Sequence, residues 1–451
     1  MTEPDTPGLF HPDLRAVSIG ATGLVVILAL EYIAVGTAMP TVAEELDGLG
    51  LYALAFAATV AASIVGMILG GWWSDHQGPA RSVVSGCLAF AAGLLVAGLA
   101  PTMEIFVIGR GLQGLGSGLA WVAVYVVIAQ TMPDALRPQV FSLLAAAWVV
   151  PGLAGPVLAG AVTEQLGWRW VFLGVVPLTL LALWALRPAL ARTAPTGDAP
   201  YLRPATIVWA LVAALSVAAL NLAGEQVSAG EVLFGVPVVV LLVVAAAALL
   251  PAGTVRLWRG LPSVVAARGL IGASFIASEA YLPLLLQQLH GYTPTAAGGV
   301  LAVGSLTWAA GSWGQSRMAD HGDRSRLLVG GCALTLIAAV LLVASVVLDW
   351  PGWTVLVIWG WASLGVGFAY PTTSLMTLRL SPPARVGANS SALQVSESLA
   401  SALVLAGAGA AFAGMYADSA RMAFSAVTLV GLLAAALALL TATRSRARVV
   451  G

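Results

Sequence analysis

The sequence predicts an all-α polytopic membrane protein with 14 transmembrane helices arranged as six, two and six. Of its 451 residues 59% are apolar and only 9% are charged, which is outside the range of soluble globular proteins. The apolar residues are grouped in runs long enough to cross a bilayer. One polar stretch occurs twice, 245 positions apart (75 to 320). The first two observations indicate that the chain is embedded in a lipid bilayer, and the third indicates how its helices are arranged.

The predicted transmembrane helices are apolar runs of about 20 residues or more, the length that spans the hydrocarbon core. Backbone groups in lipid must be hydrogen-bonded within the segment, and these runs are too long for barrel strands, so each is expected to be helical. The expected helices are 17–43, 51–73, 82–100, 105–130, 139–163, 168–190, 204–224, 231–250, 264–290, 294–316, 326–349, 352–378, 388–414 and 419–442.

The repeated stretch indicates the domain organisation. Residues 74–87 read SDHQGPARSVVSGC and residues 319–332 read ADHGDRSRLLVGGC. Each copy follows the second helix of a six-helix block and opens the third, so the chain is interpreted as a duplication of two bundles. The expected parts are a cytoplasmic N-terminal tail at 1–16, an N-terminal bundle at 17–190, a linker with two extra transmembrane helices at 191–263, a C-terminal bundle at 264–442 and a basic cytoplasmic tail at 443–451.

The distribution of basic residues predicts the orientation in the membrane. All 20 are arginines, and with the N-terminus inside only Arg169 and Arg421 fall on the outer side, while Arg110 falls within a helix. The positive-inside rule therefore predicts that both termini are cytoplasmic. The N-terminal residues show no basic n-region of a signal peptide. The exclusive use of arginine, with much Ala, Gly and Val, favours a bacterial cytoplasmic (inner) membrane protein.

Three acidic residues lie well inside expected helices: Glu31, Glu279 and Glu397. A carboxylate at membrane depth is costly, so it is usually protonated, paired or exposed to a water-filled cavity, and it is a candidate functional site. Glu31 and Glu279 occupy similar places in the first helix of each bundle, near the midplane where such folds bind substrate. The hypothesis is that Glu31 couples transport to protons, with Glu279 and Glu397 as further proton-coupling candidates. The alternative is a permanently protonated, structural glutamate.

Arg110 is the charged residue within the fourth expected helix. A guanidinium keeps its proton, so inside a membrane it must find a carboxylate, a carbonyl group or water. It can then influence the protonation of nearby acids by through-space attraction. Arg110 is therefore a fourth proton-coupling candidate, with a purely structural hydrogen-bond hub as the alternative.

Five motifs occur in order along the chain. They are Glu31 to Pro40 (EYIAVGTAMP), Gly71 to Gly78 (GWWSDHQG) with Arg81, Arg110 to Gly116 (RGLQGLG), Gly152 to Pro156 (GLAGP) with Gly160, and Trp168-Arg169-Trp170 with Phe172 and Pro177. Together they resemble the motifs of the major facilitator superfamily, specifically its 14-helix drug:proton antiporters, and this resemblance implies the major facilitator fold. Three departures are Glu31 in place of the usual Asp, His76 in place of a basic residue, and Pro151 in place of a glycine.

The resemblance also implies roles for several residues. Arg110, with Gln113 one turn on, is expected to act in proton transfer. The loop motif is expected to act as a conformational latch that holds the two bundles together in the outward-facing state. Asp75 is expected to pair with Arg137 or with a helix start near 389–391, unless it is an ordinary solvated loop charge. The latch candidates are Gly71, Asp75, Gly78, Arg81, Asp320, Arg326 and Arg137.

Small and aromatic residues complete the candidates. Glycines in the fourth and fifth helices are spaced for close helix approach, and a proline is expected to kink the fifth. The packing or hinge candidates are Gln113, Gly114, Gly116, Gly152, Gly155, Pro156 and Gly160. The aromatic candidates for an adaptable apolar substrate cavity are Tyr125, Trp148, Phe275, Tyr281, Trp308, Trp361 and Tyr370.

These features favour a transporter over an enzyme. The four histidines have no metal-binding spacing, and the Gly-rich segment of the fourth helix lacks the Lys and the strand context of a nucleotide site. We expect no metal and no cofactor, with the proton gradient as energy source. The leading hypothesis is a monomer that exports hydrophobic or amphiphilic small molecules by proton-coupled antiport and alternating access, in contact with the lipid bilayer and without nucleic acid. Uptake or symport of a specific metabolite and a non-transporting membrane sensor stay open, because cavity shape decides selectivity.

Overall fold

The computed structural model describes residues 8–195, 202–223, 229–318 and 323–446, and within them every regular element is a helix. The helices are α1 (Arg15–Glu45), η1 (Leu49–Leu51), α2 (Tyr52–Gln77), α3 (Pro79–Gly98), α4 (Met103–Thr131), α5 (Arg137–Ala146), α6 (Val149–Leu166), α7 (Arg169–Leu173), α8 (Val175–Leu190), α9 (Pro204–Ala223), α10 (Ala229–Leu249), α11 (Leu261–His290), α12 (Pro294–Met318), α13 (Arg324–Val347), α14 (Gly352–Leu380), η2 (Pro383–Arg385), α15 (Val386–Tyr416) and α16 (Ala420–Thr443).

The expected apolar runs coincide with these helices, but two of them are interrupted. The fifth run is divided between α5 and α6, and the sixth between α7 and α8 at Gly174. Each interruption lies four residues before a proline: Pro151 cannot donate a hydrogen bond to the carbonyl of Ala147, nor Pro177 to that of Leu173. The structure thus interrupts the fifth helix near Pro151, whereas the predicted kink was at Pro156.

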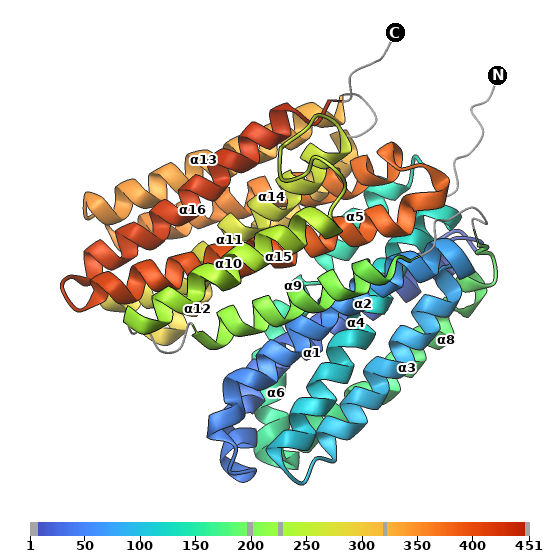
Figure 1. Ribbon diagram of the computed structural model, residues 1–451, viewed down its shortest axis with the longest axis horizontal. Coiled ribbons are helices and arrows are strands. Elements are labelled where there is room, and N and C mark those ends of the chain that lie inside the picture. The colour runs from blue at the N-terminus through green and yellow to red at the C-terminus, as the bar shows by residue number, and fades with distance from the viewer. Residues whose placement is uncertain (1–7, 196–201, 224–228, 319–322, 447–451) are drawn as a thin grey trace.

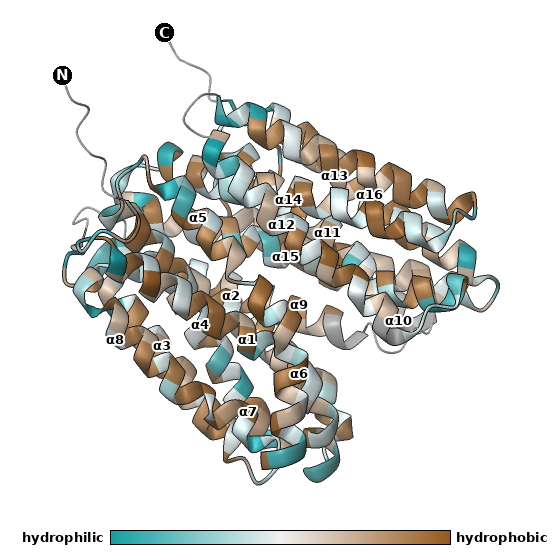
Figure 2. Ribbon diagram, turned by 180° about the vertical axis from the view of Figure 1, so that it is seen from behind, coloured by the Kyte–Doolittle hydropathy of each residue, from teal (hydrophilic) through white to brown (hydrophobic). Residues whose placement is uncertain are grey.

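Among the described residues, 11 helical segments are long and apolar enough to cross a membrane, counting each interrupted pair as one. The apolar parts of α9 and α10 that qualify are shorter, and α12 is not among the 11. The helices are apolar along their length and more polar at their ends (Figure 2). The chain is therefore a multi-pass membrane protein, for which length and hydropathy establish 11 of the 14 predicted spans.

The chain forms two helical halves, each with its own apolar core. One core extends from Leu14 to Leu190 and is joined by two leucines of α14. The other extends from Val264 to Ala442. Figure 1 shows the two halves close together near the chain termini and diverging toward the opposite end. Contacts of α2 with α15, and of α12 and α14 with α5, join them.

Close glycine contacts show that the halves are structural repeats. A side chain at Gly66 of α2 would overlap the carbonyl of Leu115 in α4, and one at Gly311 of α12 would overlap the carbonyl of Leu364 in α14. The glycines are 245 positions apart (66 to 311), the same spacing as in the repeated stretch, and their partners are 249 apart (115 to 364). The sequence duplication therefore corresponds to a repeated mode of helix packing.

Gly114 and Gly116 allow α4 to pack directly on its neighbours, as predicted. A side chain at Gly114 would overlap the Thr59 carbonyl of α2, and one at Gly116 would overlap the Phe90 backbone of α3. We expect Gly114→Val to reduce the yield of monodisperse detergent-extracted protein severely, because overpacking against backbone costs about 1–3 kcal/mol or more. Gly111→Val is the matched control, since nothing lies within 4 Å of an added Cβ there. Equal yields of the two variants would contradict the packing role.

The glycines of α6 are less confined than predicted. An added Cβ at Gly155 would lie 3.1 Å from Ile33 of α1, but the nearest atoms are 3.5 Å away at Gly152 and 3.9 Å at Gly160. The prediction that these glycines allow close approach between helices is therefore wrong for Gly152 and Gly160 in this conformation. Pro156 lies inside α6, which continues through it to Leu166.

Candidate functional site

The N-terminal half contains a buried polar cluster of Glu31, Arg110 and Gln113, three residues that the sequence singled out. Glu31 of α1 forms a buried ion pair with Arg110 of α4. The Arg110 Nη1 also donates to Gln113 Oε1 at 2.9 Å, and Gln113 Nε2 donates to Glu31 Oε1 at 3.1 Å. Arg110 and Gln113 are three residues apart on one helix, so both face α1.

The cluster depends on the charge of Glu31. The negative charge of Glu31 is stabilised by an adjacent guanidinium, and adding a proton to it removes the ionic part of that contact. The Nε of Arg110 is buried and has no hydrogen-bond partner among the described residues. A buried donor without a partner is uncommon in proteins, so the cluster has polar capacity that its own side chains leave unused.

The C-terminal half contains a second ion pair, between buried Arg268 of α11 and partly buried Glu397 of α15. Arg268 Nε donates to Glu397 Oε2 at 2.7 Å, and the Tyr370 hydroxyl of α14 donates to Glu397 Oε1 at 2.9 Å. The guanidinium carbon of Arg268 lies 3.6 Å from the centre of the Tyr370 ring, within cation–π range. Gln394 accepts a further bond from Arg268 at 3.3 Å. Each half thus places one arginine–glutamate pair in its interior.

Arg268 is the functional candidate that the sequence interpretation missed. It was counted among the cytoplasmic arginines because the expected helix began only four residues before it. In the structure α11 begins at Leu261 and buries Arg268. Its position inside an apolar run was the available signal, but its partner lies 129 residues away and only tertiary packing brings the two together.

Glu279, the third intramembrane acid, is partly buried and forms no hydrogen bond or ion pair with any described residue. It lies within electrostatic range of Tyr32 in the N-terminal half, which interacts electrostatically with Glu31 and Arg110 as well. It is also within range of Tyr370 of the second ion pair. Among the described residues, Glu279 therefore lacks the arginine partner that the other two acids have.

The predicted cavity aromatics separate into groups. Phe275 stacks on Trp359 at 4.5 Å between ring centres and packs edge-on against Trp308, which in turn contacts Tyr370 at 4.8 Å. These contacts connect Phe275 through Trp308 to Tyr370, which belongs to the second ion pair. Phe275 itself is buried in the core. Of the remaining candidates, Tyr125 packs on Phe141, Tyr281 on Phe412, and Trp148 on Tyr32 and Trp121, while Trp361 is exposed on α14.

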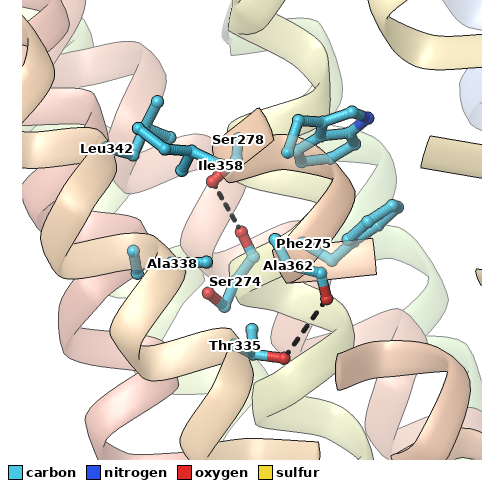
Figure 3. A pocket seen from close by; sticks show the side chains of 10 residues that line it. Ser274, Phe275, Ser278, Thr335, Ala338, Leu342, Ile358 and Ala362 are labelled. Atoms are coloured by element: carbon cyan, nitrogen blue, oxygen red, sulfur yellow. Dashed lines mark hydrogen bonds between the residues drawn. The ribbon is translucent and has the colours of Figure 1, made fainter. Parts of the chain in front are cut away.

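A small pocket lies within the C-terminal half, between α11, α13 and α14 (Figure 3). Its hydroxyl groups are engaged: Ser278 donates to the carbonyl of Ser274 at 3.1 Å, and Thr335 to that of Ala362 at 3.4 Å. The pocket has room for about one water molecule, far less than a drug-sized ligand requires. It is therefore no substrate site in this conformation. Within the described residues no group of three His, Cys, Asp or Glu side chains is arranged to hold a metal.

Asp75 connects the two halves at the end where they meet. Its carboxylate accepts hydrogen bonds from the backbone N–H groups of Gly387 at 2.6 Å and Ala388 at 2.8 Å, in the first turn of α15. Unpaired N–H groups and the helix dipole make this a favourable position for a negative charge. A side chain at Gly71, one turn earlier, would lie 2.6 Å from the Gly387 carbonyl, so the two backbones are in direct contact.

The other latch candidates have different partners. Arg137, proposed as a partner of Asp75, forms an ion pair with Asp134 and donates to the carbonyl of Ala129 at 2.6 Å. Gly78 has φ = +85°, which permits the turn from α2 into α3. Arg81 and Arg326 are exposed, and Arg81 donates to Gln77 at 2.9 Å. Asp320 lies outside the described residues.

Asp323, within the second copy of the repeated stretch, was not among the predicted site residues. It caps α13 by accepting from the backbone N–H of Ser325 at 3.0 Å, and it forms an ion pair with Arg446 at 2.9 Å. The hydrogen bond from the Ser325 side chain, with the charge of Arg446, holds the pKa of Asp323 below its usual range. The C-terminal end of the chain is thereby joined to the start of α13.

Removing the charge of Asp75 should weaken the contact between the halves. We expect Asp75→Asn to shift the protein away from the conformation described here, because an amide satisfies the α15 N-terminus less well, by about 0.3–2 kcal/mol. Distances between spin labels on the two halves would measure the shift. Asp418→Asn, an exposed acid in the α15–α16 connection, is the control. An unchanged distance distribution in Asp75→Asn would contradict the latch role.

The architecture defines a class of protein. A polytopic helical membrane protein built from two repeated halves has the design of many transporters. Residues 21–405 match the sequence profile of the Major Facilitator Superfamily. The chain belongs to the major facilitator superfamily, so it is a membrane transporter of small molecules and not an enzyme, and the predicted resemblance is confirmed.

Relatives and solved structures agree with this assignment. "Probable multidrug-efflux transporter Rv1634" of Mycobacterium tuberculosis (strain ATCC 25618 / H37Rv) is 29% identical over 462 residues, covering 92% of this chain and 93% of the relative. The human organic anion transporter MFSD10 has a similar fold, with a TM-score of 0.70 at 17% identity, covering 95% of this chain and 99% of the other. A bacterial homologue of the iron transporter ferroportin, solved in an outward-facing state, gives a TM-score of 0.70 at 12% identity, with the same coverage.

Proposed function

We propose that the protein is a proton-coupled antiporter that exports hydrophobic or amphiphilic compounds by alternating access. The observation that carries this proposal is the buried cluster in which Glu31 is paired with Arg110 and Gln113. The multidrug-efflux name of a relative that is similar over nearly its whole length supports the substrate class.

In the proposed mechanism a proton and the substrate alternate at this cluster. Protonation of Glu31 removes the ionic contact with Arg110 and lets α1 and α4 rearrange, while loss of the proton restores the pair. Since α1 also contacts α5 and α6, which both contact α12, a change at Glu31 reaches helices that touch the other half. Arg268, Glu397 and the unpaired Glu279 form a second group of ionisable side chains through which a further proton can act.

The proposed arrangement in the membrane has 14 spans, with six in each half and α9 and α10 as the extra pair. The division into 17–190, 191–263 and 264–442 follows from it. Both termini are cytoplasmic in a bacterial inner membrane, the working unit is a monomer, and the proton gradient drives transport without a cofactor. With this orientation the halves meet at the cytoplasmic end, which makes the conformation described here outward-facing.

The test uses everted membrane vesicles that contain the protein and are energised to acidify their lumen. A pH-sensitive dye reports proton release while lipophilic cations, dyes and antibiotics are added one at a time. We expect release by some of these compounds and none in vesicles without the protein. Substrate-dependent proton movement in the opposite sense would indicate symport, and failure of every compound to move protons would contradict the proposal.

A further inference from the structure

The two extra helices cover one of the two seams between the halves. We call the line where α2 meets α15 the covered seam. Ile64 and Ile68 of α2, with Val395 and Leu399 of α15, form one apolar cluster with buried residues of α9 and α10. Figure 1 shows α9 and α10 running along the boundary between the two halves. If α2 and α15 moved apart to open this seam to the lipid, they would disrupt an apolar cluster that includes side chains of four helices.

The duplication provides a second seam, where α12 meets α5 and α6, which we call the open seam. Equivalent positions of α2 and α12 are 245 apart, and those of α4 and α14 are 249 apart. The first residues of α5 and α15, 137 and 386, are also 249 apart, and we use this spacing to compare α5–α6 with α15. Ile68 (9% exposed) thus corresponds to Trp313 (56% exposed), and Leu399 (4%) corresponds to Val150 (65%). Positions that are buried at the covered seam are accessible at the open seam, and the residues there are apolar.

The open seam is lined by small side chains and leads to the candidate site. An added Cβ at Gly152 of α6 would meet only Ser305 Oγ of α12, at 3.5 Å, so small side chains face each other across it. Trp148, at the start of α6, contacts the ring of Tyr32 at 6.2 Å between ring centres. Tyr32 is next to Glu31 in the chain. The contact between Trp148 and Tyr32 therefore connects this seam to the helix that carries Glu31.

We propose that α9 and α10 close the covered seam to the bilayer, and that lipophilic substrate dissolved in the membrane enters the protein through the open seam, between α6 and α12. The inference rests on the proposed export function and adds the route of entry. A compound that partitions into the hydrocarbon phase meets apolar side chains there and avoids passing through water. The transporter has two equivalent seams by its internal repeat, but the two extra helices thus leave only one of them accessible from the lipid.

The first test maps the route in the wild-type protein. A diazirine derivative of a transported lipophilic compound is added to phosphatidylethanolamine–phosphatidylglycerol vesicles that contain the protein, photoactivated, and located by mass spectrometry with and without excess unmodified compound. We expect labelling that the compound competes away on α6 and α12, near Val150 and Trp313. Competable labelling near Ile68 and Leu399, or labelling at the open seam that excess compound does not reduce, would overturn the proposal.

The second test obstructs the open seam. Ser305→Trp places a large ring where Gly152 leaves space, and Gly330→Trp is the control because nothing lies within 4 Å of an added Cβ on that face of α13. We expect Ser305→Trp to raise the KM of a strongly membrane-partitioning substrate about tenfold with kcat little changed, while a weakly partitioning substrate and the control are unaffected. An equal effect on both substrates, or none, would contradict the route. A wild-type protein that transports neither compound would contradict the proposed function itself.

Discussion

Glu31→Gln is expected to abolish substrate-driven proton release from everted vesicles, lowering its initial rate at least about tenfold while substrate binding is retained. The amide keeps an oxygen that can accept from Arg110 and Gln113, but like the protonated carboxyl group it carries no charge. It cannot take up or release a proton, so the exchange between proton and substrate is lost. The pH-dye signal and the binding of a fluorescent substrate, measured on the same vesicles, separate the two effects.

Two further variants make this result specific. Glu44→Gln changes an exposed acid near the end of the same helix and should behave as the wild type. Glu31→Asp restores a carboxylate on a shorter side chain and should recover part of the coupling. If Glu31→Gln moved protons as fast as the wild type under an imposed pH gradient, the coupling role of Glu31 would be wrong.

Breaking the second ion pair should produce the largest loss of stability. Arg268→Gln leaves the Glu397 carboxylate without its cation, and because the Glu397 side chain is 23% exposed, the cost is expected to fall below the about 3–5 kcal/mol of a fully buried pair. We therefore expect a clearly lower midpoint of thermal unfolding in detergent. We also expect Glu397→Gln added to Arg268→Gln to restore much of the loss, since the uncompensated charge is then gone.

The matched comparison is an exposed pair of the same chemistry. Arg421 and Asp349 form an ion pair at 2.6 Å in which both side chains are about half exposed. Arg421→Gln should leave the midpoint of thermal unfolding nearly unchanged, because water already solvates both charges. A double mutant of Arg268 and Glu397 that is no more stable than Arg268→Gln alone would show that the two residues are not energetically paired.

The functional residues differ in how far the sequence could predict them. Glu31, Arg110 and Gln113 were identifiable because polar side chains inside apolar runs are costly, and the structure places all three in one cluster. Arg268 was assigned to the wrong environment because it lies close to the start of its run. Even where a charged residue is predicted to be buried, the sequence does not identify the residue that pairs with it. Glu397 and Arg268 meet because α11 and α15 pack together, and that proximity is absent from any local pattern.

The sequence by itself determined the solvent, the helical class, the positions of the apolar runs and the duplication, because each depends on composition or on periodicity along the chain. Only the tertiary structure decided which acid has a cation, that Asp75 meets the N-terminus of α15 rather than Arg137, and that α9 and α10 cover one seam and leave the other accessible. These features depend on contacts between residues far apart in the chain. Apolar helices of similar composition can pack in many ways, so the choice among them is made by side-chain shape and close backbone contact.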